Sequence, residues 1–172
     1  MDILLILLRI LHIIAGVLWV GGALHFFLFI GPSVQATAPE SQKFMAHLMT
    51  QKRWSQFMSA MSLLTVLAGG ALYYRLGSVN WRWVTTGPGI GFTIGSLAGL
   101  LVLAAGVFII GPRTNRLGRI SQEIQANGGS PPANQVAILQ RTQRELEILG
   151  KVNFVLILIA LLTMSTARYW TF

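Results

Sequence analysis

The sequence contains no cysteine among its 172 residues, so disulfides, iron–sulfur clusters and thiolate zinc sites are excluded. Charged residues are also scarce, at 10% of the chain, whereas a typical soluble domain has about 25%. Hydrophobic residues make up 53%. Too few charges remain to cover a surface that faces water. Lipid around most of the chain removes this difficulty, and the composition therefore predicts an integral membrane protein.

The few charges are divided unevenly between the two signs. Thirteen Lys and Arg residues outnumber five Asp and Glu residues, and the formal net charge is +8. A nucleic-acid partner is not indicated, because long apolar stretches separate the basic residues and leave no continuous basic patch. Interfacial Lys and Arg side chains that face anionic lipid account for the charge, so the expected partner is the lipid bilayer.

Four apolar runs are long enough to cross a bilayer, which requires about 20 helical residues. These runs cover residues of about 3–30, 55–75, 89–111 and 151–168. Gly31-Pro32 is expected to stop the first helix, and Gly111-Pro112 to end the third span, because proline disrupts a helix. The chain is therefore predicted to be all-α and to form a single domain (1–172), a polytopic membrane protein built as a four-transmembrane-helix bundle.

The connections between spans also carry helix signals. Thr37-Ala38-Pro39-Glu40 has the pattern of a capping box, which predicts a helix that starts there and continues into the second span. Apolar residues at helical spacing continue beyond Pro112 as far as Asn127, and Ser130-Pro131 starts a further helix that leads into the fourth span. Helices 2, 3 and 4 are therefore expected to extend into the cytoplasm, with the last two forming a hairpin.

The distribution of basic residues predicts the orientation in the membrane. With four spans both termini lie on one side, which carries four basic residues, and the other side carries nine. The four are Arg9, Arg75, Arg82 and Arg168, and the nine are Lys43, Lys52, Arg53, Arg113, Arg116, Arg119, Arg141, Arg144 and Lys151. The side with nine is expected to be cytoplasmic, in a bacterial inner membrane, with both termini outside. Aromatic residues at 81, 83, 169 and 170 would form an outer belt.

Polar residues inside a span are the candidates for chemistry, because each is costly in lipid without a partner. The first span contains Arg9, His12 and His25. At about 100° per residue, Arg9, Gly16 and Trp19 share the helix face of His12. His25 lies on a different face and roughly 20 Å further along the helix. The two histidines therefore cannot hold one metal ion from a single chain, and each counts as a separate candidate metal ligand.

A group of glycines lies at the depth of His12 in the other spans, including Gly69 and Gly95. A flat macrocycle between helices needs such space beside an axial ligand, and neutral imidazole is a common ligand of haem iron. His12 is therefore a candidate axial ligand of haem b. Arg9 would pair with the haem propionates, and Met164 of the fourth span is a candidate second ligand.

Each of these residues also has a structural interpretation. Glycines four residues apart commonly let membrane helices approach one another closely. His12 could form only a hydrogen bond to a neighbouring helix, and Arg9 could extend to the outer interface. His25 lies at the depth of Ser59 and Ser62, which suggests either a polar cluster or a proton relay. No catalytic triad is present, and no predicted span contains a carboxylate.

The first span has His12, then Trp19 seven residues later and Gly22 ten residues later. In this pattern the chain resembles a group of bacterial membrane proteins that includes the CopD-type copper-resistance proteins and the HemJ-type protoporphyrinogen oxidases. It is most similar to an uncharacterised four-helix integral membrane protein family within that group. The resemblance to HemJ-type proteins implies haem binding at His12. Those proteins also use a lysine in a later span, which this chain lacks.

The leading interpretation is a membrane-embedded haem-binding protein or subunit that works in redox chemistry or electron transfer. One alternative is a copper-handling permease of CopD type that uses His12, His25 and the methionines, which are soft ligands. The other is a cofactor-free structural or assembly subunit of a membrane complex. A homo-oligomer or a larger complex is compatible with all three.

Overall fold

The computed structural model describes residues 2–37, 41–77, 81–126 and 133–172, and every regular element in them is helical. The α-helices are α1 (Ile3–His25), α2 (Gly31–Ala36), α3 (Gln42–Thr50), α4 (Trp54–Gly77), α5 (Trp81–Val84), α6 (Gly87–Ala104), α7 (Gly111–Ala126) and α8 (Ala133–Thr166). Two π-helical segments, η1 (Phe26–Ile30) and η2 (Ala105–Ile110), join α1 to α2 and α6 to α7. A 3-10 turn, η3 (Ala167–Tyr169), follows α8.

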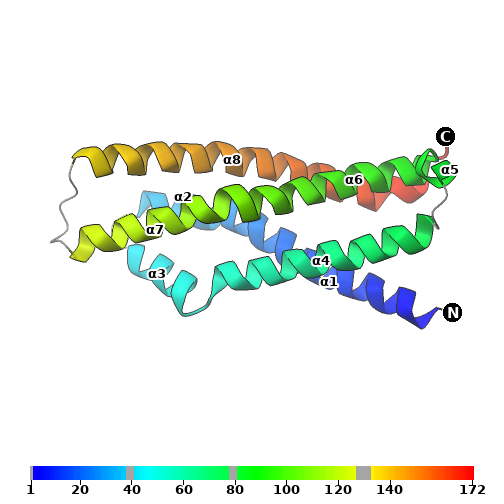
Figure 1. Ribbon diagram of the computed structural model, residues 1–172, viewed down its shortest axis with the longest axis horizontal. Helices are drawn as coiled ribbons and strands as arrows, with labels where there is room; N and C mark the ends of the chain where they lie inside the picture. Colours follow the sequence, from blue (N-terminus) through cyan, green and yellow to red (C-terminus); the bar gives the residue numbers. More distant parts are fainter. Residues whose placement is uncertain (1, 38–40, 78–80, 127–132) are drawn as a thin grey trace.

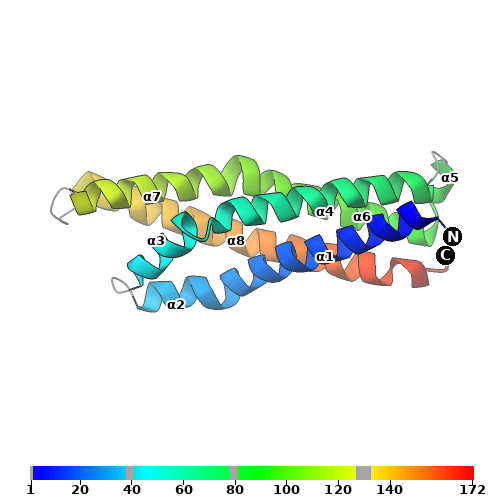
Figure 2. The same ribbon diagram turned by 90° about the horizontal axis from the view of Figure 1, so that it is seen from below.

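The long helices run along one common axis and form two pairs (Figures 1 and 2). In one pair α1 packs chiefly on α4, in the other α6 packs chiefly on α8, and α4 also contacts α6. Both termini lie at one end of the molecule, together with α5 (Figure 1). Four stretches of the described chain are long and apolar enough to span a membrane: Ile3–Ala36, Trp54–Arg75, Gly87–Ile124 and Gln135–Tyr169. For the described residues, the prediction of an all-helical fold with four such helices is confirmed.

The buried core is small and consists mainly of small side chains. The buried apolar residues are Ala15, Ala68, Leu72, Ala98, Val102, Ile157 and Ala167. Large apolar side chains instead face outward along all four long helices, as Ile13, Leu67 and Leu162 do. A water-soluble chain of this size would bury such side chains against one another. Helix contacts here depend on close backbone approach rather than on large buried side chains.

The first helix does not stop at Gly31-Pro32, and in this respect the sequence-based prediction is wrong. The Gly31 N–H donates to the Phe26 carbonyl, five residues earlier, and the helical path continues through Pro32 to Ala36. Proline removes a hydrogen bond to the preceding turn and its ring crowds that turn. The wider π turn of η1 absorbs both effects. Gly-Pro therefore changes the winding of this helix without ending it.

The same arrangement recurs before Gly111-Pro112, where the third span was expected to end. The Gly111 N–H donates to the Gly106 carbonyl at the end of η2, and α7 continues the helix. A Cβ at Gly111 would lie 3.0 Å from the Gly106 carbonyl oxygen, and one at Gly31 would lie 3.3 Å from that of Phe26. Glycine suits both positions because the π turn brings a carbonyl close to its Cα.

The helix predicted to lead from Thr37 into the second span is broken. The capping-box residues 38–40 lie outside the described part of the chain. The helix α3 ends at Thr50, where the N–H groups of Gln51 and Lys52 both donate to the His47 carbonyl. Arg53 then has a φ of 51°, in the left-handed region, which no α-helix can include. The chain therefore turns before α4, and α3 is a separate connecting helix.

The third and fourth helices are longer than their apolar spans, as predicted. The third follows α6, η2 and α7 from Gly87 to Ala126, and α8 alone has 34 residues. Their extensions pack against each other as a hairpin. Its turn lies at residues outside the described part of the chain. Arg113 of α7 bonds to Glu145 of α8 at 3.2 Å and joins the two extensions.

The pairing of α6 with α8 depends on buried glycines on α6, among them Gly91 and Gly95. A Cβ at Gly91 would lie 2.7 Å from the Ala167 Cβ and 3.0 Å from its Cα. Ala167 is fully buried, so neither atom can move aside easily. This contact sets the distance between the two helices near the end that carries the termini.

We predict that Gly91→Ala lowers the thermal unfolding midpoint in detergent, because overpacking costs about 1–3 kcal/mol. Gly99→Ala is the matched control on the same helix, since a Cβ there would meet nothing within 4 Å. Circular dichroism on heating measures both variants. Equal midpoints for the two variants would show that close approach at Gly91 does not hold the pair together.

Candidate functional site

The His12 side chain reaches from α1 to the backbone of α4. Its Nδ1 lies 2.8 Å from the Thr65 carbonyl oxygen. A carbonyl oxygen only accepts hydrogen bonds, so Nδ1 carries the proton and donates. In the neutral imidazole Nε2 then keeps an unprotonated lone pair. The contact between the two helices thus selects one tautomer of His12.

Gly69, one turn beyond Thr65 on α4, provides the surface on which the imidazole lies. A Cβ at Gly69 would lie 2.7 Å from Cε1 of His12 and 2.8 Å from its Nδ1. Any side chain at this position would therefore push the ring away from α4. His12 and Gly69 are therefore in direct contact, and the imidazole itself fills the space beside Gly69 that was expected to accommodate a macrocycle.

The other predicted residues of α1 differ in their surroundings. Gly16, one turn further along, faces the Thr65 side chain, since a Cβ there would lie 3.5 Å from its Cγ2. Trp19 is half-buried, whereas Arg9 is exposed on the outside of the helix. Gly16 thus belongs to the same helix contact as His12. Arg9 is available to a group outside the described chain.

Gly95 and Met164 form a second contact, between α6 and α8. A Cβ at Gly95 would lie 2.6 Å from Cγ of Met164 and 2.8 Å from Oγ1 of Thr163. The Met164 side chain therefore takes up the space that glycine leaves. The predicted site residues accordingly divide between two helix pairs, with His12, Gly16 and Gly69 in one and Gly95 and Met164 in the other.

His25 is separate from His12, as the helix geometry predicted. Its side chain is exposed, and its ring lies 5.2 Å from that of Phe29 in a tilted arrangement. Ser62 and Ser59, which were expected near its depth, donate to carbonyls of their own helix. Among the described residues no group of three or more His, Cys, Asp or Glu side chains could hold a metal ion.

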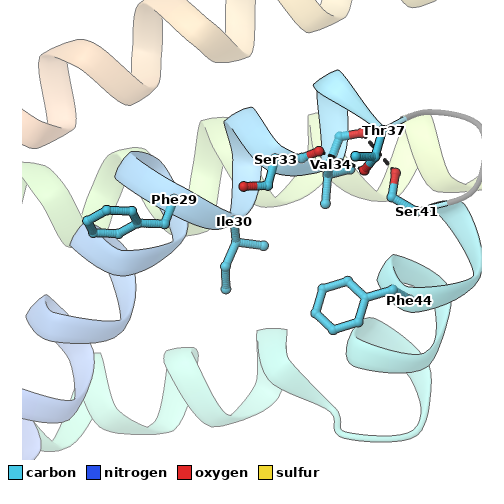
Figure 3. Close-up of a pocket in the computed structure, with 7 residues that line it drawn as sticks. All are labelled: Phe29, Ile30, Ser33, Val34, Thr37, Ser41 and Phe44. Carbon is cyan, nitrogen blue, oxygen red and sulfur yellow. Dashed lines mark hydrogen bonds between the residues drawn. The ribbon is translucent and has the colours of Figure 1, made fainter.

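A groove of about 330 Å³ lies between the end of the first long helix and α3 (Figure 3). It is lined by Phe29, Ile30, Ser33, Val34, Thr37, Ser41 and Phe44. The Thr37 and Ser41 hydroxyls donate to the carbonyls of Ser33 and Val34, each at 2.8 Å. None of its lining residues has a titratable side chain. The groove can therefore hold an apolar ligand but provides no side chain for acid–base or metal chemistry.

Sequence reasoning missed two of the contacts that position α1 on α4. Thr65 accepts the hydrogen bond from His12 through its backbone carbonyl. Every residue has such a carbonyl, so the residue type at position 65 could not indicate this contact. Asp2 pairs with Arg75 at 3.1 Å, which joins the start of α1 to the last turns of α4. Opposite charges at the neighbouring ends of antiparallel helices were the available signal for this pair.

The contact with Thr65 leaves Nε2 as the free nitrogen of His12. A backbone carbonyl that fixes the Nδ1–H tautomer is the usual second partner of an imidazole whose Nε2 binds a metal. The ring is half-buried and rests against a helix backbone, so its orientation is restricted. Nε2 can therefore bind iron or copper, or accept a hydrogen bond.

We predict that Gly69→Ala destabilises the α1–α4 pair, because its Cβ displaces the His12 ring from the Thr65 carbonyl. Gly70→Ala is the control at the next residue, since a Cβ there would meet nothing within 4 Å. Nitrogen-15 NMR of labelled histidine should show a protonated Nδ1 for His12 in the wild type and in Gly70→Ala, but a changed signal in Gly69→Ala. An Nδ1 that is unprotonated in the wild type would contradict the tautomer.

No family model, curated protein or solved structure matches this chain.

Proposed function

We propose that this chain is a bacterial inner-membrane protein that binds haem b through Nε2 of His12 and serves in electron transfer or as a redox subunit. In this proposal the four long helices cross the membrane with both termini outside. The extensions of the third and fourth helices, α7 and the first part of α8, then lie in the cytoplasm. The bond from Nδ1 of His12 to the Thr65 carbonyl, 2.8 Å long, is the observation that carries the proposal.

The outward-facing apolar surface supports a location in lipid. Ile3, Val17 and Leu67 are more than half exposed, and such side chains occur along all four long helices. An aqueous environment would make this surface an aggregation site, whereas a bilayer solvates it. The excess of Lys and Arg at the α7–α8 end supports the orientation, since cytoplasmic ends of spans are enriched in these residues.

The donor chemistry of His12 fits a haem iron. The half-buried ring is fixed as the Nδ1–H tautomer, so its other nitrogen, Nε2, is a neutral ligand. Bound haem would supply a one-electron redox centre. Arg9 lies three residues before His12 on the same helix, exposed, and would pair with a propionate. Met164 packs against Gly95, so the proposal assigns the protein ligand to His12 alone.

We expect protein purified in detergent, after expression with ample haem, to show a Soret band that His12→Ala abolishes. His25→Ala is the matched control, because it removes an exposed histidine from the same helix. Gly69→Ala should weaken haem binding by about 10- to 100-fold, as loss of a ligand's second partner does. Ultraviolet–visible spectroscopy and haem titration give these values.

A folding defect in His12→Ala is separated from loss of the ligand by adding free imidazole, which should restore the Soret band if the site is intact. Colourless wild-type protein would contradict the proposal. Colourless protein with a stoichiometric partner would point to an assembly subunit. Copper in metal analysis that depends on His12 and His25 would point to the permease.

A further inference from the structure

The hairpin formed by α7 and α8 contains a polar cavity of about 260 Å³. Arg116 lines it from α7, and Ile138, Arg141, Thr142 and Glu145 line it from α8. No residue of this group belongs to the contacts around His12. The cavity is therefore a second candidate site, and the helix extensions that line it lie towards the end of the molecule opposite the chain termini (Figure 1).

Glu145 is fully engaged by two arginines. Its Oε2 accepts from Nε of Arg113 at 3.2 Å, and its Oε1 accepts from Nε of Arg141 at 3.1 Å. Glu145 precedes the predicted fourth span, and the bonds from Arg113 and then Arg141 lower its pKa below the usual value. Each carboxylate oxygen already has a cationic donor, so Glu145 does not need Arg116 as well.

Arg116 therefore adds positive charge that the cavity itself does not neutralise. Among the described residues it makes no ion pair or hydrogen bond, and its side chain is exposed. The lining of the cavity thus contains two guanidinium groups, those of Arg116 and Arg141, and one carboxylate, that of Glu145. Thr142 has only 8% of its surface exposed, and its hydroxyl likewise has no partner within the described chain. A cavity with excess positive charge and a hydroxyl donor is suited to a phosphate group.

The depth of the cavity favours a lipid phosphate. The apolar part of the third helix ends at Gly111, and Arg113 and Arg116 follow it by about 3 and 7.5 Å at 1.5 Å per residue. The headgroup layer of a bilayer occupies about 5–8 Å on each side of the hydrocarbon core. In the proposed orientation the guanidinium groups thus lie at the level of lipid phosphates. Basic pockets between helices on this side bind anionic headgroups.

We propose that the cleft between α7 and α8 binds the headgroup phosphate of an anionic phospholipid. Arg116 is the principal donor, and Arg141 and the Thr142 hydroxyl complete the contact. Glu145 holds Arg141 in position through their bond within α8. Bound lipid would join the two helix extensions at the membrane surface. This site depends on the predicted membrane placement and does not depend on haem.

The test is titration of the full-length protein in neutral detergent with phosphatidylglycerol or phosphatidylcholine of the same acyl chains, with bound lipid counted by native mass spectrometry. We expect phosphatidylglycerol to bind more tightly. Arg116→Gln should weaken that binding by about five-fold, the contribution of one basic residue near anionic lipid. Thr142→Val keeps the side-chain shape and should weaken it by about three-fold, the contribution of one hydrogen bond.

Arg119→Gln is the matched control, because it removes the same charge from an exposed position of α7 that does not line the cavity. It should leave the affinity nearly unchanged, and circular dichroism checks that all variants stay helical. Equal losses in Arg116→Gln and Arg119→Gln, or equal affinities for the two lipids, would overturn the proposal. Displacement of phosphatidylglycerol by inorganic phosphate would make the free anion the ligand and would also overturn it.

Discussion

The imidazole of His12 holds α1 against α4 through two contacts that depend on each other. The ring lies on the bare backbone of Gly69, and in that position its Nδ1 reaches the Thr65 carbonyl. A polar side chain in an apolar span needs such a partner, because an unpaired polar group in lipid is costly. The same bond fixes the tautomer. The packing of α1 on α4 and the tautomer of His12 therefore share a single cause.

The two helix pairs are packed in the same way. Their helices approach closely, with glycine or alanine on one side and a side chain such as His12 or Met164 on the other. In each pair one helix, α1 or α6, continues through a π-helical segment and a Gly-Pro step at the end of its apolar stretch. The π turn accommodates proline within a continuous helix, so that α7 can extend far enough to pair with α8.

Charged groups lie at the two ends of this arrangement. At one end Asp2 and Arg75 join α1 to α4, and at the other Arg113 and Arg141 share Glu145. Exposed ion pairs contribute little stability. Their main effect is on the register of the paired helices and on the net charge at each end of the molecule. The α7–α8 end keeps an excess of positive charge after Glu145 is paired. Such an end is suited to anionic partners, and the opposite end is closer to neutral.

Apolar run length and the scarcity of charge were enough to predict four long helices and an all-α fold, because these properties depend only on composition along the chain. Helical periodicity likewise placed Gly16 in the same helix contact as His12 and separated His25 from it. The sequence could not reveal that Gly-Pro would be absorbed by π turns, that Arg53 would break the helix before α4, or that Thr65 would accept from His12. Those outcomes depend on backbone groups and on the distance between helices. Backbone atoms are the same in every residue, so only tertiary packing decides which of them meet a side chain.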